Sequence, residues 1–147
     1  MHLAQHIETH IHTGDAADTV TLDYEARFLR RKRLVSDRGE PFLVELAETQ
    51  SLNQGEGFRL DDGRIIAVMA AAEPLLAVRH DNLARIAWHV GNRHTPCQIA
   101  DDHILIREDK VLQAMLEGLG ASVTQVTAPF TPEGGAYGHG RTHGHEH

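Results

Sequence analysis

The chain of 147 residues has a single cysteine, Cys97, and no long apolar run. One cysteine cannot form an intramolecular disulfide, so we expect a reducing compartment in which Cys97 is a small apolar residue or a free thiol. No apolar segment approaches the roughly 18 residues of a membrane helix. Residues 1–13 also lack the basic start and apolar stretch of a signal peptide. These absences predict a cytoplasmic protein with no membrane segment.

Basic residues are too few to balance the acidic ones, and the formal net charge is −7. Nucleic-acid binding is therefore disfavoured. Six of the fourteen basic residues nevertheless form one basic patch: Arg27, Arg30, Arg31, Lys32, Arg33 and Arg38. Such a patch is typical either of an edge strand protected from aggregation by its charges or of a contact with an acidic partner. Phe28 is the one aromatic residue among these bases, which again argues against stacking on nucleic-acid bases.

Motifs of catalytic metal sites are also missing. A catalytic zinc ion usually has three protein ligands on a rigid frame, and the chain has neither a His-Glu-x-x-His segment nor a cysteine pair. His89 and His94 lie on either side of Gly91, which we expect to end a helix, so they cannot share a helix face. We therefore expect no enzymatic activity. A small metallohydrolase would require His89, His94 and His103 to converge on one ion.

The first half of the chain reads as strands. Residues 2–12 alternate with a period of two, which puts Leu3, Ile7 and Ile11 on one face of a strand. The opposite face carries His2, His6, Glu8, His10 and His12 and is either a plain solvent-facing surface or a holder of a divalent metal. Further strands are expected at residues 19–22, 28–35 and 42–46, with a turn at 37–40 and a hairpin around Asp61-Asp62-Gly63. The pattern predicts a small all-β domain over residues 1–73.

The second half alternates strands and helices. Glu73-Pro74 marks the boundary, and strands are expected at residues 75–79, 97–100, 103–107 and 122–126. Helices are expected at residues 81–90 and, starting near Asp109, through Val111, Leu112, Met115, Leu116 and Leu119. The order β-α-β-β-α-β predicts a ferredoxin-like domain over residues 74–130, with two helices on one face of an antiparallel sheet. The fold class is thus α+β, followed by a disordered tail over residues 131–147.

The first of these helices ends just before a histidine. Leu83, Ile86, Ala87 and Val90 recur at helical spacing after Asp81, a suitable N-cap. Gly91 suits the left-handed position after a helix, and Pro96 restricts the residue before it to extended backbone. His94 therefore lies in a defined loop, either as a solvated residue or as a metal ligand.

The tail is rich in histidine. His139, His143, His145 and His147 alternate with glycine and polar residues that cannot build a core. A segment of this composition is typical of flexible metal binding. A purification tag is the alternative interpretation, although tags are normally unbroken histidine runs.

Gly91-Asn92-Arg93-His94, between a helix and an extended segment, resembles the signature of the urease accessory protein UreE family, the nickel metallochaperones of urease maturation. The resemblance covers essentially the whole chain, because the family also has a β-rich N-terminal half, a ferredoxin-like C-terminal half and often a histidine-rich tail. It implies a homodimer that binds Ni(II), with Zn(II) or Cu(II) as alternatives at the same site. It also implies action with a GTPase accessory protein on the urease pre-activation complex, and a protein-interaction role for the N-terminal half.

The resemblance further implies that His94 is the principal ligand, with two copies meeting across a two-fold axis and tail imidazoles completing the shell. Some family members have histidines at the start of the second helix, where this chain has Glu108 and Lys110. We therefore expect the tail histidines to supply the additional metal ligands. Metal binding by His89, His103, Cys97 or the N-terminal histidines stays open, as do higher oligomers and the partner of the basic patch. A histidine-tailed zinc or nickel storage protein is the alternative function.

Overall fold

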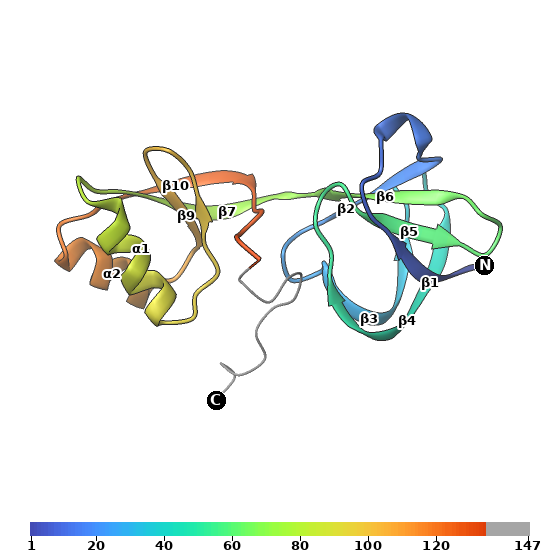
Figure 1. Cartoon of the computed structure of the whole chain (residues 1–147), viewed down its shortest axis with the longest axis horizontal. Helices are drawn as coiled ribbons and strands as arrows, with labels where there is room; N and C mark the ends of the chain where they lie inside the picture. The colour runs from blue at the N-terminus through green and yellow to red at the C-terminus, as the bar shows by residue number, and fades with distance from the viewer. Residues whose placement is uncertain (135–147) are drawn as a thin grey trace. The chain divides into compact units, whose positions relative to one another are not determined.

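The computed structural model describes residues 1–134, which form two compact units (Figure 1). The first unit is Met1–Ala71 and the second is residues 72–134. Each has its own cluster of buried apolar side chains. None of the helices within residues 1–134 has the length and apolar character needed to cross a membrane.

The first unit is a curled sheet of six strands in the order β2-β6-β5-β1-β4-β3 (Figure 1). The strands are β1 His2–Glu8, β2 Asp18–Leu22, β3 Phe28–Val35, β4 Pro41–Ser51, β5 Gly57–Leu60 and β6 Ile65–Ala70, with a short 3-10 helix η1 at Thr13–Asp15. Two neighbouring pairs, β1 with β4 and β2 with β6, are parallel, whereas the other pairs are antiparallel. Phe42 and Phe58 lie at the centre of the core, fully buried, with ring centroids 5.8 Å apart.

The hairpin expected around Asp61-Asp62-Gly63 is confirmed as the β5–β6 connection. Its turn is closed by the Leu60 N–H donating to the Arg64 carbonyl at 2.8 Å. Gly63 has φ +90°, a left-handed conformation that glycine adopts without a Cβ clash. The three turn residues and the apolar segments that flank them were sufficient to locate this hairpin.

The continuous histidine face expected over residues 2–12 is wrong. β1 ends at Glu8, and its register against β5 shifts between Ala4 and His6. Ala4 is fully buried although the alternation placed it with the polar residues. The irregularity breaks the period of two, because an extra residue rotates the side chains that follow it to the other face. His10, with φ 56°, and His12 lie beyond the strand.

Arg27 does not belong to the exposed basic patch. Its side chain is 1% exposed, and its guanidinium donates to the carbonyls of Leu22 at 2.9 Å and Leu52 at 3.1 Å. A buried guanidinium requires such acceptors. Here they are the carbonyls of Leu22, the last residue of β2, and of Leu52, which directly follows β4. The four basic residues of β3, residues 30–33, are exposed. This strand lies at one edge of the sheet.

The second unit combines a four-stranded sheet with two helices (Figure 1). Its elements are β7 Ala72–Arg79, α1 Leu83–Asn92, β8 Gln98–Ile99, β9 Ile104–Arg107, α2 Lys110–Gly118 and β10 Ser122–Pro129. The strand order is β10-β7-β9-β8, and every neighbouring pair is antiparallel. Both helices contribute to one core with alternate residues of β7 and β9: Leu76, Val78, Ile86, Val90, Ile104, Ile106, Leu112 and Leu116.

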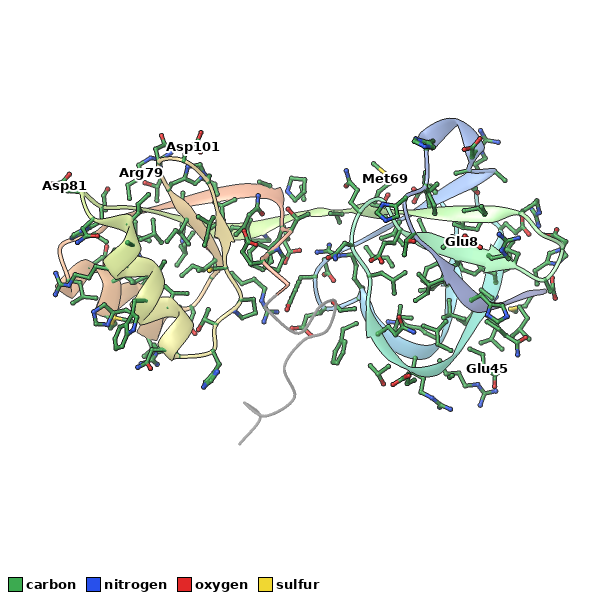
Figure 2. All side chains as sticks on the ribbon, in the orientation of Figure 1. Glu8, Glu45, Met69, Arg79, Asp81 and Asp101 are labelled. Atoms are coloured by element: carbon green, nitrogen blue, oxygen red, sulfur yellow. The ribbon has the colours of Figure 1, made fainter. Side chains whose placement is uncertain are left out.

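The helix starts show where capping could be read from sequence. Asp109, expected near the start of the second helix, is the N-cap of α2 and accepts from the Leu112 N–H at 3.0 Å. The start of α1 was predicted two residues early, because Asn82 and not Asp81 is its N-cap and accepts from the Arg85 N–H at 3.2 Å. Asp81 is an exposed residue just before the helix (Figure 2). Adjacent Asp and Asn are nearly equivalent caps, so their ranking cannot choose between them.

The chain stays attached to the second unit after β10. Phe130 is fully buried, and the Thr131 N–H donates to the Gln98 side-chain oxygen at 2.9 Å. The Glu133 N–H donates to the Cys97 carbonyl at 2.9 Å. Residues 131–133 are therefore bonded to Cys97 and Gln98, at the start of β8.

Candidate metal site

His94 is held by the end of α1. Ile86 and Val90 are fully buried and fix this helix on the sheet. Beyond the helix, the N–H groups of Arg93 and Thr95 donate to the Val90 carbonyl at 3.2 and 3.3 Å, and the His94 N–H donates to the Gly91 carbonyl at 2.9 Å. The backbone on both sides of His94 is thus bonded to the last helical turn, while the histidine itself is exposed.

The left-handed residue of this loop is His94, with φ 56°, and not Gly91 as the sequence predicted. Gly91 lies inside α1, which runs two residues further than expected. A Cβ at Gly91 would meet no atom within 4 Å. Histidine is one of the residues enriched in left-handed backbone, yet such a position is uncommon outside glycine and is frequent at functional sites. The local geometry therefore singles out the histidine itself.

The other histidines of the second unit do not join His94 in one site. His103 lies just before β9, and its Nδ1 is 2.7 Å from the Asp102 carboxylate. His89 is half-buried on α1, and its ring meets the Trp88 ring edge-on at a centroid distance of 5.0 Å. Within residues 1–134, no group of three ligand side chains with donor atoms inside 4.8 Å includes His89, His94 or His103. Within the described residues, the three histidines that a metallohydrolase site would require do not converge on one position.

Cys97 is half-buried against the core of the second unit. Burial raises the pKa of its thiol, and the Glu133 carboxylate raises that pKa further. The thiol is therefore protonated at neutral pH, whereas metals bind the thiolate. Cys97 is a poor ligand candidate in this state.

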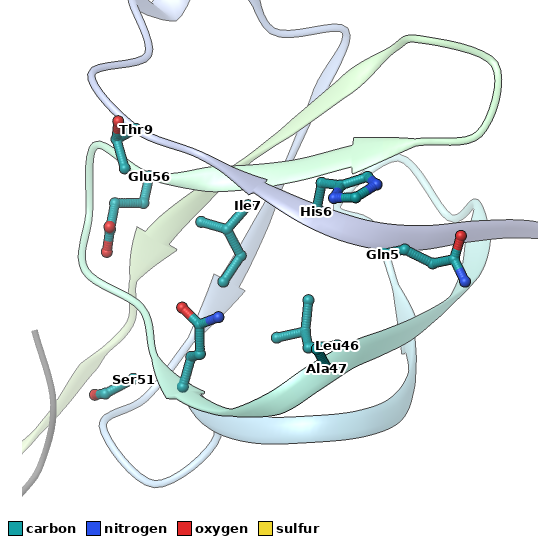
Figure 3. Close-up of a pocket in the computed structure, with 9 residues that line it drawn as sticks. Gln5, His6, Ile7, Thr9, Leu46, Ala47, Ser51 and Glu56 are labelled. Atoms are coloured by element: carbon teal, nitrogen blue, oxygen red, sulfur yellow. The ribbon is translucent and has the colours of Figure 1, made fainter.

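The N-terminal histidines occupy separate surroundings. His6 lines a pocket of about 300 Å³ beside β1 and β4, together with Ile7 and Leu46 (Figure 3). His2 instead contacts the β5–β6 turn, with its Nδ1 2.6 Å from Asp61. The histidines expected as tail ligands, His139, His143, His145 and His147, lie outside the described residues.

His80 is a structural histidine that the sequence did not reveal. Its Nδ1 accepts from the Asn82 N–H at 2.8 Å, and its Nε2 lies 3.2 Å from the Leu119 carbonyl. A carbonyl only accepts, so Nε2 is the donor in this contact. The ring thereby joins the start of α1 to the end of α2. The one feature of the sequence that could have indicated this role is the position of His80 directly after a strand. Its contact with Leu119 depends on the fold.

Family comparisons cover both units. Residues 2–71 match the model described as the N-terminal domain of the UreE urease accessory protein, and residues 73–147 match its C-terminal domain.

Individual relatives agree with the family models. The urease accessory protein UreE of Ruegeria pomeroyi is 57% identical over 136 residues, which cover 92% of this chain and 91% of that protein. The protein of the same name from Rhodobacter capsulatus is 61% identical over 132 residues, covering 90% and 84% of the two chains. That from Paracoccus denitrificans is 61% identical over 123 residues, covering 84% and 79%. This chain therefore belongs to the UreE family of urease accessory proteins.

Proposed function

We propose that the protein binds Ni(II) in the cytoplasm and delivers it for assembly of the urease active site. Membership of the UreE family establishes that this protein is an accessory chaperone of urease and that it is not an enzyme. The observation that supports metal delivery is the exposed His94, whose backbone is left-handed and bonded to the end of α1. Imidazole is a suitable ligand for nickel, and also for zinc and copper, which are the alternative cargoes.

Delivery requires ligands that hold the ion and then release it. A single exposed imidazole per chain is too few for a closed site, so we infer a homodimer in which two His94 rings share one ion across a two-fold axis. Exposed apolar side chains support a partner surface on this unit, since Trp88 on α1 is 63% exposed and Val111 on α2 is 68% exposed. Tail imidazoles of His139, His143, His145 and His147 would complete the shell.

The roles of the two domains follow from the same proposal. We assign the second unit, residues 74–130 in the sequence-based division, to the ferredoxin-like arrangement as the metal-binding and dimerisation domain. The antiparallel order β10-β7-β9-β8 and two helices on a single core support this assignment. Residues 1–73 then serve protein interaction, with the exposed bases of β3 meeting an acidic surface. The GTPase accessory protein and the urease pre-activation complex are the proposed partners.

Storage of zinc or nickel is the competing function. A storage protein must bind many metal ions, whereas a delivery protein must bind the protein that receives its metal ion. Pull-down from urease-expressing cells with and without added Ni(II) separates the two, because delivery predicts nickel-dependent recovery of urease maturation proteins. Recovery of none of them under either condition would favour storage.

Substitution of His94 tests the metal site. Metal titration combined with sedimentation should find one tightly held Ni(II) per dimer, lost in His94→Ala while weaker binding persists. A bridging ion ties metal affinity to self-association, so tight binding should also weaken on dilution. His89→Ala is the matched control, because it removes a neighbouring imidazole of the same helix end and should keep the tight ion. Retention of one tight Ni(II) per dimer in His94→Ala would overturn the proposal.

A further inference from the structure

His2, Asp61 and Asp62 form a second cluster of ligand side chains, on the first unit. Within residues 1–134 it is the one group of three His, Cys, Asp or Glu side chains whose ligand atoms all lie within 4.8 Å of one another. Two elements build it: His2 opens β1, and the aspartates form the β5–β6 turn. The Asp61 N–H donates to the Leu3 carbonyl at 2.9 Å and fixes the turn beside the strand. We call these residues the His2 cluster.

The hydrogen bonds of His2 determine which ring nitrogen is available. Its Nδ1 lies 2.6 Å from Oδ1 of Asp61, whose second oxygen accepts from the Leu3 N–H at 3.2 Å. An ionised carboxylate only accepts, so the proton is on Nδ1. Nε2 is then the ring nitrogen that can bind a metal ion.

The Nε2 atom of His2 lies 3.5 Å from Oδ2 of Asp62. Two ligand atoms that each lie about 2.1 Å from one ion are roughly 3 to 3.5 Å apart at octahedral or tetrahedral angles. Nitrogen and oxygen are thus already at the spacing of two ligands of one ion. Asp61 stands in the place of the carboxylate that commonly orients a metal-bound histidine through its other nitrogen.

Arg64 is the group that opposes a cation here. Its Nε donates to Oδ2 of Asp62 at 2.7 Å, but its guanidinium also makes two hydrogen bonds to Glu40, at 2.7 and 2.6 Å. Three carboxylates, those of Asp61, Asp62 and Glu40, thus accompany the single guanidinium of Arg64. Each carboxylate oxygen has more than one lone pair, so Asp62 can bind an ion while keeping its bond to Arg64.

We propose that the His2 cluster is a low-affinity site for a divalent transition metal ion, with His2 Nε2 and an Asp62 oxygen as ligands and Asp61 as the positioning residue. Water completes the coordination shell, as expected for an exposed site with two protein ligands. Imidazole with carboxylate suits Ni(II) and Zn(II) alike. This site is separate from His94, and it does not rest on the proposed delivery function.

Paramagnetic broadening by Ni(II) tests the site in the full-length chain. Nitrogen-15 amide spectra with increasing NiCl₂ should show progressive loss of the Leu3 and Gly63 signals, because these amides adjoin the ligands. His2→Ala should abolish that loss, whereas His6→Ala, a matched change of an exposed histidine on the same strand, should leave it intact. His94→Ala should also leave it intact, so failure of the proposed function and failure of this site are distinguishable.

Asp61→Asn tests positioning. The amide keeps the size of the side chain but removes the anionic acceptor, so Ni(II) affinity at this site should fall about 10- to 100-fold. Nitrogen-15 shifts of the His2 ring should show its proton leaving Nδ1, a signature that a merely structural role would not produce. Unchanged affinity and unchanged ring shifts would overturn the role of Asp61. Absence of broadening at Leu3 and Gly63 in the wild type, or its persistence in His2→Ala, would overturn the site.

Discussion

The two units place their exposed histidines by different means. In the second unit, main-chain hydrogen bonds around the end of α1 hold the backbone of His94. In the first unit, ionised carboxylates of the β5–β6 turn hold the His2 ring. Backbone placement is indifferent to pH over the range in which side chains change charge. Placement by carboxylates depends on their remaining ionised.

The same contrast extends to the charges of each unit. Ion pairs within residues 1–134 include Arg64 with Glu40 and Arg59 with Glu8 in the first unit, each at 2.6 Å, and His103 with Asp102 in the second. Exposed pairs of this kind contribute little individually. The carboxylates of the β5–β6 turn are the ones whose ionisation bears on the position of His2.

The largest expected effect separates the two cores. Phe58→Ala removes a fully buried ring from the core of the first unit and should lower that unit's stability by about 3–5 kcal/mol. Because the second unit has its own core, protection of its β9 amides against hydrogen exchange should hardly change. Ile86→Ala is the reciprocal variant and should affect the second unit instead. Equal loss of protection in both units would show that they unfold as one.

Acid should distinguish the units next. The hydrogen bond from Arg64 lowers the pKa of Glu40, and that from His2 lowers the pKa of Asp61. A folded-state pKa below the unfolded value gives stability that is present above about pH 4 and is lost as pH falls through the folded value. In the second unit, among described residues, the corresponding carboxyl is Asp102, whose pKa the His103 hydrogen bond lowers.

Hydrogen exchange measured per unit between neutral pH and pH 2 checks this expectation. The opening free energy of the first unit should fall more steeply with acidification than that of the second. Asp61→Asn should reduce the slope of the first unit and leave that of the second unchanged. Parallel slopes in the wild type would mean that the carboxylates of the β5–β6 turn do not contribute differentially to folding.

Local patterns predicted the elements of this fold better than they predicted contacts between elements. The β-rich first half, the two-helix second half, the strand at residues 28–35 and the helix start near Asp109 are confirmed, because each depends on a pattern within a few residues. The burial of Arg27 could not be read from its neighbours, since its acceptor at Leu52 is 25 residues away. Nor could the pairing of His2 with the Asp61-Asp62 turn, which depends on β1 lying beside β5.

The candidate site divides in the same way. The Gly91-Asn92-Arg93-His94 segment directed attention to a loop after α1, and the structure has that loop. The assignment of left-handed backbone to Gly91 was wrong because glycine is favoured at that position but not required to occupy it. Helix ends shift by one or two residues with little energetic cost, so composition alone cannot fix which residue lies outside the last turn.

The smallest expected effect follows from that correction and compares two glycines of the second unit. Gly91 is helical, and a Cβ there meets no atom within 4 Å, so Gly91→Ala should stabilise the unit by about 0.5 kcal/mol, through reduced unfolded-state entropy and better helix propensity. Gly120, which follows α2 with φ +90°, is the matched control, and Gly120→Ala should destabilise by about 1 kcal/mol because alanine disfavours that backbone. Urea unfolding of both variants measures the two signs. Destabilisation by Gly91→Ala would mean that this glycine does adopt left-handed backbone in solution, and His94 would then no longer be the residue singled out by the geometry of the loop.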